Sequence, residues 1–362
     1  MPNNFSSIAS HMDAVETPDS LRRLIDMHRF PDETNYSFRE IVNRHNSPLK
    51  KEQKFLFLNT YLMDVAVFKR AQKPAVEDRS KAIGRFIREH FDVAALCEVF
   101  EENINDIILE QWNSERKPYY VGNIAGVTWR SSGLVTYSQK MKISKRGFHE
   151  FEAEEGHDAK ADKGILMAEV DVGLGRSKLE IYSTHLNAEG NEARRKQLGE
   201  LTAFIRRTHN SSNPAILVGD FNVHTKNRGT FNSPLSGNKV TEYEYLYELM
   251  EDIGFYDLWI DRNGSLGYTN NMDQIYVARR ICTMDSNSIY CNDNILNPAI
   301  DADRIDYIFV SKPNVENSFN LDFTRPRRTT QMRPSNAPER DKIAYLSDHL
   351  GLATTLILSP KD

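Results

Sequence analysis

The sequence predicts an α/β domain whose sheets are covered by helices. Eight short apolar runs have the length of buried strands, and segments with helical periodicity lie between several of them. The 362 residues, 40% of them hydrophobic, can bury a sizeable core. They fit either one large domain with additions or two smaller domains.

The expected strands follow one another along the chain from Lys54 to the C-terminus. They are Phe55–Leu58, Val93–Leu96, Gly133–Tyr137, Ile165–Val170, Leu179–Ser183, Ala215–Val218, Ile305–Val310 and Leu352–Leu358. Two helices are expected between them. Arg79–His90 places Ile83, Phe86 and Ile87 on one face, and Glu192–Arg206 repeats this pattern.

The chain divides by composition into an extension and a main domain. Residues 1–50 are polar and carry helix signals around Thr17–Met27, which predicts a helical N-terminal extension. The main domain is expected at 51–362, with a long surface excursion near 261–301 that is rich in Asn, Asp, Ser and Gly.

Charge and cysteine content favour some function classes over others. The net charge of −5 disfavours a processive binder of duplex DNA. Neither a secretory signal nor an 18-residue apolar stretch is visible, so a cytoplasmic location without a membrane span is expected. Cys97 is expected in the core. Cys282 and Cys291 could bridge a loop, but three cysteines without zinc-ligand spacing better fit a reducing compartment.

Polar residues stand where the apolar runs end, and rigid strand ends can hold such groups in fixed geometry. Glu98 follows an apolar run, where a carboxylate must be solvated, paired or metal-bound. Asp220 and Asn222 would point to the same side if their strand continued that far. The complete set, in chain order, is Asn59, Glu98, His185, Asp220, Asn222, Asp306, Asp348 and His349.

These residues in this order resemble the endonuclease/exonuclease/phosphatase family, over roughly 300 residues from Lys54 onward. The matching motifs are Leu58-Asn59-Thr60, Cys97-Glu98-Val99, Thr184-His185-Leu186, Gly219-Asp220-Phe221-Asn222, Arg304-Ile305-Asp306-Tyr307 and Ser347-Asp348-His349. The resemblance implies a DNase I-like fold, a four-layered sandwich of two mixed sheets flanked by helices. It also implies the hydrolysis of a phosphate ester with Mg²⁺, for which Mn²⁺ could substitute.

The resemblance assigns a role to each residue. Glu98 is the expected main Mg²⁺ ligand, with Asn59 and Asp348 nearby, because Mg²⁺ prefers oxygen ligands. Asp220 is expected to orient or deprotonate the attacking water. Asn59, Asn222 and His185 are expected to contact substrate. His185 and His349 are the imidazoles for acid–base work, and Asp306 is expected to fix the tautomer of one of them, with the choice between the two histidines open.

Finer matches resemble the sphingomyelinase-like branch of the family. They are Glu98-Val99-Phe100, the His-Leu-x-Ala-Glu-like segment from His185 to Glu189, Lys163-Gly164 before a strand, and Gly267-Tyr268-Thr269. This branch predicts a phosphodiesterase that acts on a lipid headgroup in preference to nucleic acid, with peripheral membrane contact. Trp259 and Tyr268 are candidates for that contact, with burial in the core as the alternative.

Three other readings stay open at this point. A nuclease or nucleotide phosphodiesterase is the second candidate, because Arg325-Pro326-Arg327-Arg328 and Arg333 could meet phosphates. An inositol-polyphosphate 5-phosphatase is disfavoured, since the Trp-Cys expected before Asp303-Arg304 is absent. A non-catalytic scaffold is a minor alternative, because every expected polar position is filled.

Overall fold

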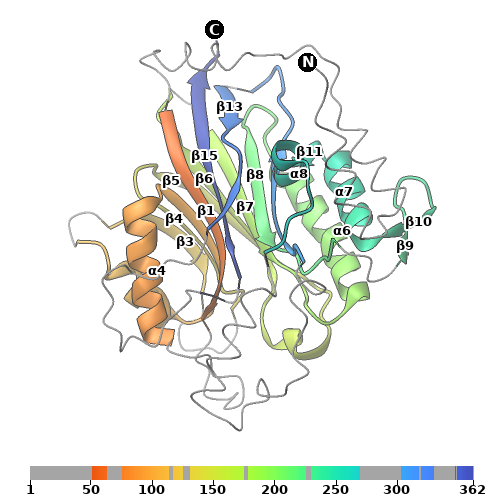
Figure 1. Ribbon diagram of the computed structural model, residues 1–362, viewed down its shortest axis with the longest axis horizontal. Coiled ribbons are helices and arrows are strands. Elements are labelled where there is room, and N and C mark those ends of the chain that lie inside the picture. The colour runs from red at the N-terminus through yellow and green to blue at the C-terminus, as the bar shows by residue number, and fades with distance from the viewer. Residues whose placement is uncertain are drawn as a thin grey trace.

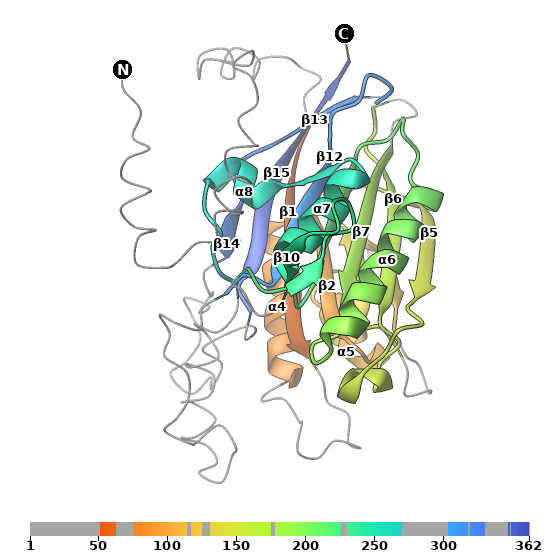
Figure 2. The same ribbon diagram turned by 90° about the vertical axis from the view of Figure 1, so that its right-hand side faces the viewer.

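Two β-sheets pack face to face, and helices cover the outer face of each (Figures 1 and 2). The computed structural model describes residues 51–62, 76–113, 117–124, 131–174, 178–225, 230–269, 303–317, 319–329, 347 and 349–361. The predicted extension 1–50, most of the excursion, Cys282, Cys291, Arg333 and Asp348 therefore lie outside the described residues.

The first sheet has seven strands in the described part of the chain, in the order β13-β15-β1-β2-β4-β3, with β14 paired to β15. β1 and β2 run parallel, while β15 and β4 join them antiparallel. The strands are β1 (Lys51–Leu62), β2 (Val93–Val99), β3 (Tyr119–Asn123), β4 (Leu134–Ser138), β13 (Phe319–Phe323), β14 (Arg327–Thr329) and β15 (Gly351–Pro360).

The second sheet has six strands in the order β11-β12-β8-β7-β6-β5. Here β7 and β8 are the parallel pair, so both sheets are mixed, as the family resemblance implies. The strands are β5 (Ile143–Glu150), β6 (Gly164–Asp171), β7 (Lys178–His185), β8 (Ala215–Asp220), β11 (Phe255–Asp257) and β12 (Asp306–Ser311). A separate hairpin joins β9 (Thr230–Asn232) and β10 (Lys239–Thr241).

Helices form the two outer layers, and three apolar clusters join the four layers. α4 (Val76–His90) and α5 (Glu102–Leu109) pack on the seven-stranded sheet, while α6 (Asn191–Thr208) and α7 (Glu242–Asp252) pack on the six-stranded sheet. The central cluster lies between the sheets and includes Phe57, Ile181 and Leu356. α8 (Leu258–Asn263) and a 3₁₀ helix at Gly156–Lys160 complete the described elements.

The four-layered architecture confirms the predicted fold class. All eight predicted apolar runs lie in or overlap strands, and α4 and α6 contain the two predicted helices. Cys97 is a buried free thiol, as predicted. Trp259 is buried in the central cluster, which favours its core reading over membrane contact. Among the described helices, none is long and apolar enough to cross a membrane.

Candidate active site

The polar strand ends converge at one end of the two sheets. In the first sheet, Asn59 is paired with the residue before Glu98 on the parallel strand β2. In the second sheet, His185 is paired with Asp220 on the parallel strand β8, and Asp306 pairs with Asp220 from the antiparallel strand β12. Parallel strands bring their carboxyl ends to one edge, so five predicted residues meet where the two sheets face each other.

The Asn59 side chain links the two sheets through its amide. Asn59 Nδ2 donates to Glu98 Oε1 at 3.0 Å and to Asp220 Oδ2 at 2.9 Å. Asn59 Oδ1 accepts from the backbone N–H of Tyr61 at 3.1 Å, which fixes the orientation of the amide. One buried amide therefore holds carboxylates from both sheets in place.

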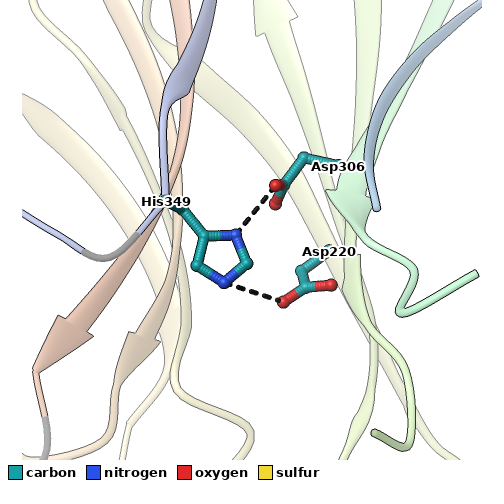
Figure 3. Close-up of side chains that lie close together, drawn as sticks. All are labelled: Asp220, Asp306 and His349. Atoms are coloured by element: carbon teal, nitrogen blue, oxygen red, sulfur yellow. Dashed lines mark hydrogen bonds and ion pairs between the residues drawn. The ribbon is translucent and has the colours of Figure 1, made fainter. Parts of the chain in front are cut away.

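His349 forms a dyad with Asp306, which answers the question that the sequence left open (Figure 3). His349 Nδ1 lies 2.8 Å from Asp306 Oδ2, and His349 Nε2 lies 3.7 Å from Asp220 Oδ2. The hydroxyl of Thr269 accepts from the backbone N–H of Asp306 at 3.1 Å. Because the Asp306 carboxylate accepts a hydrogen bond from Nδ1–H, Nε2 is the ring nitrogen that faces Asp220 and is available for proton transfer.

The surroundings of Asp220 raise the pKa of its carboxyl group toward neutrality. Burial, followed by the nearby Asp306 carboxylate, raises the pKa of Asp220 from its ordinary value of 3.8 to about 7. His349, the Asn59 amide and Lys163 oppose this rise. A carboxyl group with a pKa near the working pH is well suited to proton transfer.

His185 lies on the other side of Asp220 and is held neutral. Its Nε2 is 3.7 Å from Asp220 Oδ2, and its buried Nδ1 has no hydrogen-bond partner among the described residues. Burial, followed by the charges of Lys163 and His349, lowers the pKa of His185 well below its ordinary value. It therefore enters the site as a neutral imidazole rather than as a cation.

Lys163 is a charged residue beside the site that the sequence reading did not place there. Its side chain is 3% exposed; Nζ donates to the carbonyl of Leu186 at 2.7 Å and lies 3.2 Å from Asp158 Oδ1. The carbonyl of Leu186 also accepts from Asn222 Nδ2 at 3.0 Å. The Lys163-Gly164 step before β6 was the available signal, but it was read only as a mark of the family branch.

Asn222 does not continue the strand that carries Asp220. β8 ends at Asp220, and Asn222 has a left-handed backbone with φ of 51°. Its backbone N–H donates to Asp220 Oδ1 at 2.9 Å, which forms a tight turn. The strand therefore does not continue far enough for alternation to align the two side chains, and the backbone of Asn222 instead turns back to the Asp220 carboxylate.

Backbone strain is concentrated at this end of the molecule. Tyr61, Glu98 and Asn222 are the non-glycine residues with positive φ in the described part of the chain, at 53°, 63° and 51°. The β1–β2 register shifts between Asn59 and Leu62, so Tyr61 lies in an irregular turn of the strand. Such conformations cost about 1–3 kcal/mol each and cluster at functional sites, where they aim side chains.

The carboxylates form an oxygen-rich set that fits a hard divalent cation. Asp220, Asp306 and His349 offer ligand atoms within 4.8 Å of one another, and the half-buried Glu98 joins them through Asn59. Asp306 Oδ1 is buried without a hydrogen-bond partner among the described residues. This concentration of negative charge suits Mg²⁺, which prefers carboxylate oxygens.

The predicted metal ligands are placed unequally. Glu98 is half-buried at the end of β2. Its Oε1 accepts from Asn59, and no hydrogen bond to Oε2 is seen among the described residues. Asn59 turns its nitrogen toward both carboxylates, so in this arrangement it positions them, and its role as a ligand stays a prediction. Asp348 lies outside the described residues, so its role also stays a prediction.

A family model decides the assignment that these residues suggest. The model of the Endonuclease/Exonuclease/phosphatase family matches residues 57–349, a span that contains the whole predicted site. The chain belongs to the endonuclease/exonuclease/phosphatase family. The predicted family resemblance is therefore confirmed.

Relatives within the family are similar at low identity. Sphingomyelin phosphodiesterase 2 of Rattus norvegicus is 27% identical over 295 residues, which are 77% of this chain and 60% of the relative. The chain thus spans about 60% of the length of that relative.

Solved structures of other proteins share the fold. A variant of beta toxin from Staphylococcus aureus with bound magnesium ions has a TM-score of 0.54 at 17% identity, covering 86% of this chain and 100% of its own. TDP2 of D. rerio, complexed with a single-strand DNA product, has a TM-score of 0.57 at 15% identity, covering 84% and 99%. Identities this low show the shared fold alone, which hosts several substrates.

Proposed function

We propose that the chain is a Mg²⁺-dependent phosphodiesterase that hydrolyses a phosphate ester in a lipid headgroup, in the manner of a sphingomyelinase C. The observation that carries the proposal is the Asn59 amide, which joins Glu98 to Asp220 beside the Asp306–His349 dyad. The Asn59 amide thereby fixes the carboxylate proposed to bind the metal, Glu98, relative to the groups proposed to transfer protons, Asp220 and His349.

The geometry supports a division of proton transfers between two groups. The Asp220 carboxylate accepts a proton from the attacking water as its oxygen bonds to phosphorus. His349, as an imidazolium held by Asp306, donates a proton from Nε2 to the leaving oxygen as the phosphorus–oxygen ester bond breaks. The 3.7 Å separation of His349 Nε2 and Asp220 Oδ2 then allows the proton to return to His349 after release of product.

Charge on the phosphoryl group needs compensation that these residues do not supply alone. Mg²⁺ held by Glu98, or Mn²⁺ in its place, would polarise a phosphoryl oxygen and neutralise developing charge. The neutral His185 and the second amide hydrogen of Asn222 would hydrogen-bond phosphoryl oxygens. Lys163 adds a buried positive charge behind Leu186.

A lipid headgroup is favoured over nucleic acid by three further observations. The curated relatives are named sphingomyelin phosphodiesterases, and the chain is acidic overall. Arg325 and Arg327, from the basic run considered as a nucleic-acid contact, line a pocket on the outer face of the seven-stranded sheet rather than the strand ends that hold Asp220.

A substrate panel tests the proposal. With Mg²⁺, the chain should release phosphocholine from sphingomyelin micelles and leave supercoiled plasmid intact at the same enzyme concentration. Excess EDTA and Glu98→Gln should both remove the activity. Plasmid nicking faster than headgroup release would replace the lipid proposal with a nuclease. Hydrolysis of neither these substrates nor bis-p-nitrophenyl phosphate would indicate a scaffold.

A further inference from the structure

A basic pocket lies on the seven-stranded sheet, away from the candidate active site. It has a volume of about 610 Å³ and is bounded by the end of α4 and by β1, β14 and β15. Its basic side chains are Lys54, His90, Arg325, Arg327 and Arg328. This volume is in the range of pockets that bind small molecules and lipid headgroups.

Strand alternation separates this pocket from the catalytic residues. Phe55 and Phe57 of β1 face the core between the sheets, and Asn59 follows them on that side. Lys54 and Leu56 point to the other side, where Leu56 packs with the α4 layer. Lys54 is also five residues from Asn59, roughly 16 Å along the strand. The pocket and the active site are therefore on opposite faces of one sheet.

The positive charges of the pocket are largely uncompensated. Among the described residues that line it, none is acidic, and no described carboxylate pairs with Lys54 Nζ or Arg327. Asp92, which accepts from the backbone N–H of Lys54 at 2.9 Å, is already paired with Lys140 Nζ at 2.6 Å. The pocket is therefore positively charged, although the chain as a whole has a net charge of −5.

The arginines present hydrogen-bond donors in a fixed arrangement. Arg325 Nε donates to Asn263 Oδ1 at 2.7 Å, which holds its guanidinium in place. The Arg328 guanidinium stacks 3.8 Å from the centre of the Tyr268 ring, and its Nη1 is buried without a hydrogen-bond partner among the described residues. Guanidinium groups held in this way suit planar, bidentate recognition of phosphate oxygens.

The C-terminal end of α4 does not make the pocket unfavourable for an anion. A helix carboxyl end carries partial negative charge, which would repel an anion. Here Gln139 Nε2 donates to the carbonyls of Ile87 and Arg88, both at 3.1 Å, and to that of Phe91. These carbonyls are thus already satisfied, and the hydroxyl of Thr355 adds a neutral donor to the wall.

We propose that this pocket binds a compact ligand carrying two or more phosphate groups, as a site independent of catalysis. Clustered phosphates match several fixed cationic donors within one headgroup-sized volume, whereas a single phosphate would leave most of them unmatched. Such a ligand can come free in solution or as the headgroup of a polyphosphorylated lipid, and both present the same chemistry.

Calorimetric titration with pyrophosphate, in EDTA, tests the site directly. The wild-type chain should bind with a stoichiometry of one, and Lys54→Gln/Arg327→Gln should weaken binding at least tenfold. Arg206→Gln/Lys312→Gln removes the same charge from surface ion pairs of the six-stranded sheet and should bind like wild type. Glu98→Gln should also bind like wild type, because the catalytic site is not used.

Three results would overturn the proposal. They are the absence of saturable binding, an equal loss in the Arg206/Lys312 control, and loss of binding in Glu98→Gln. Vesicles with phosphatidylinositol bisphosphate then separate the two sources of the ligand. Recruitment above that by phosphatidylserine vesicles of equal charge indicates the lipid, and pyrophosphate binding without recruitment indicates the free form. Tighter binding of a single-stranded oligonucleotide than of pyrophosphate would replace the proposed ligand with nucleic acid.

Discussion

Glu98 is the residue on which the proposed metal chemistry depends most. It ends β2 with φ of 63°, and its Oε1 is held by Asn59. Replacement by Gln keeps the shape but removes the charge that binds a cation. We expect Glu98→Gln to lower phosphodiesterase activity about 100-fold or more, a loss typical of removing transition-state stabilisation, without unfolding the chain.

The measurement is initial rate with bis-p-nitrophenyl phosphate in saturating Mg²⁺, alongside thermal unfolding. The exposed Glu102, four residues further on at the start of α5, supplies the matched control Glu102→Gln. Full activity in folded Glu98→Gln, or in wild type with excess EDTA, would contradict the assignment.

Asp220 should make the stability of the chain depend on pH. In metal-free buffer its pKa is about 7 in the folded state against 3.8 when unfolded, so the folded state binds more protons between these values. Stability from this group is therefore highest below about pH 4 and falls as pH rises to about 7. The loss amounts to a few kcal/mol at most, at about 1.4 kcal/mol per pKa unit.

Asp220→Asn removes this titration while an oxygen remains to accept from Asn59. The melting temperature of the variant relative to wild type should rise between pH 5 and pH 7 by several degrees, at about 2–4 °C per kcal/mol. Activity should be lost at every pH. A pH-independent difference in melting temperature would show that Asp220 does not carry a raised pKa.

A site residue could be predicted from the sequence where the end of its strand could be predicted. Asn59, Glu98, His185 and Asp220 each follow an apolar run, and those runs became β1, β2, β7 and β8. Their hydrogen bonds were not predictable, because pairing across two sheets depends on register and packing. The partner of Asp306 is one such case, since both histidines lie near Asp220 and only the fold places His349 at 2.8 Å from Asp306.

At the scale of elements, the misses have physical reasons. β5 lies at a sheet edge and fully buries none of its side chains, so it lacks the buried alternation that identifies a strand. α7 buries Glu242, Glu244 and several tyrosines, and its apolar face is poorly marked by composition. A signal did exist there, because Thr241 and Glu244 form a capping box, a pattern legible in sequence.

Arg304 anchors the segment that delivers Asp306 to the site. It is fully buried, with Nη1 and Nη2 donating to the two carboxylate oxygens of Asp257 at 3.0 and 2.7 Å. Its guanidinium also lies 4.4 Å from the centre of the Tyr307 ring. Arg304→Met leaves the Asp257 carboxylate buried without its cationic partner, so we expect a loss of about 3–5 kcal/mol in the free energy of unfolding.

Urea unfolding measures this loss. The variant to compare with Arg304→Met is the double variant Arg304→Met/Asp257→Asn. Without the unpaired charge, the double variant should be more stable than Arg304→Met alone. A single variant that loses less than about 1 kcal/mol would show that the pair does not hold this segment.

At the scale of the whole molecule, charge distribution separates the lipid and nucleic-acid alternatives. The chain is acidic overall, and the described basic pocket lies on the sheet face opposite to Asn59. A nuclease must bind many phosphates through a positive groove, and its affinity falls steeply with salt because counterions are released. In the proposed function, a neutral phosphocholine headgroup would offer one phosphate to the site, where a carboxylate-bound metal and the imidazoles would compensate its charge.

Salt should therefore have little effect on hydrolysis of neutral sphingomyelin micelles. Between roughly 20 and 150 mM NaCl, where the Debye length shortens to about 8 Å, we expect activity to change less than about threefold. Micelles that also carry a polyphosphorylated lipid should show a stronger salt dependence, because the pocket of Lys54 and Arg327 would add screened attraction at the surface. That added dependence should vanish in Lys54→Gln/Arg327→Gln, while activity on neutral micelles stays unchanged. A steep salt dependence on neutral micelles in both proteins would instead mean that substrate binding itself uses exposed positive charge. Nucleic acid would then be favoured over a lipid headgroup as the substrate.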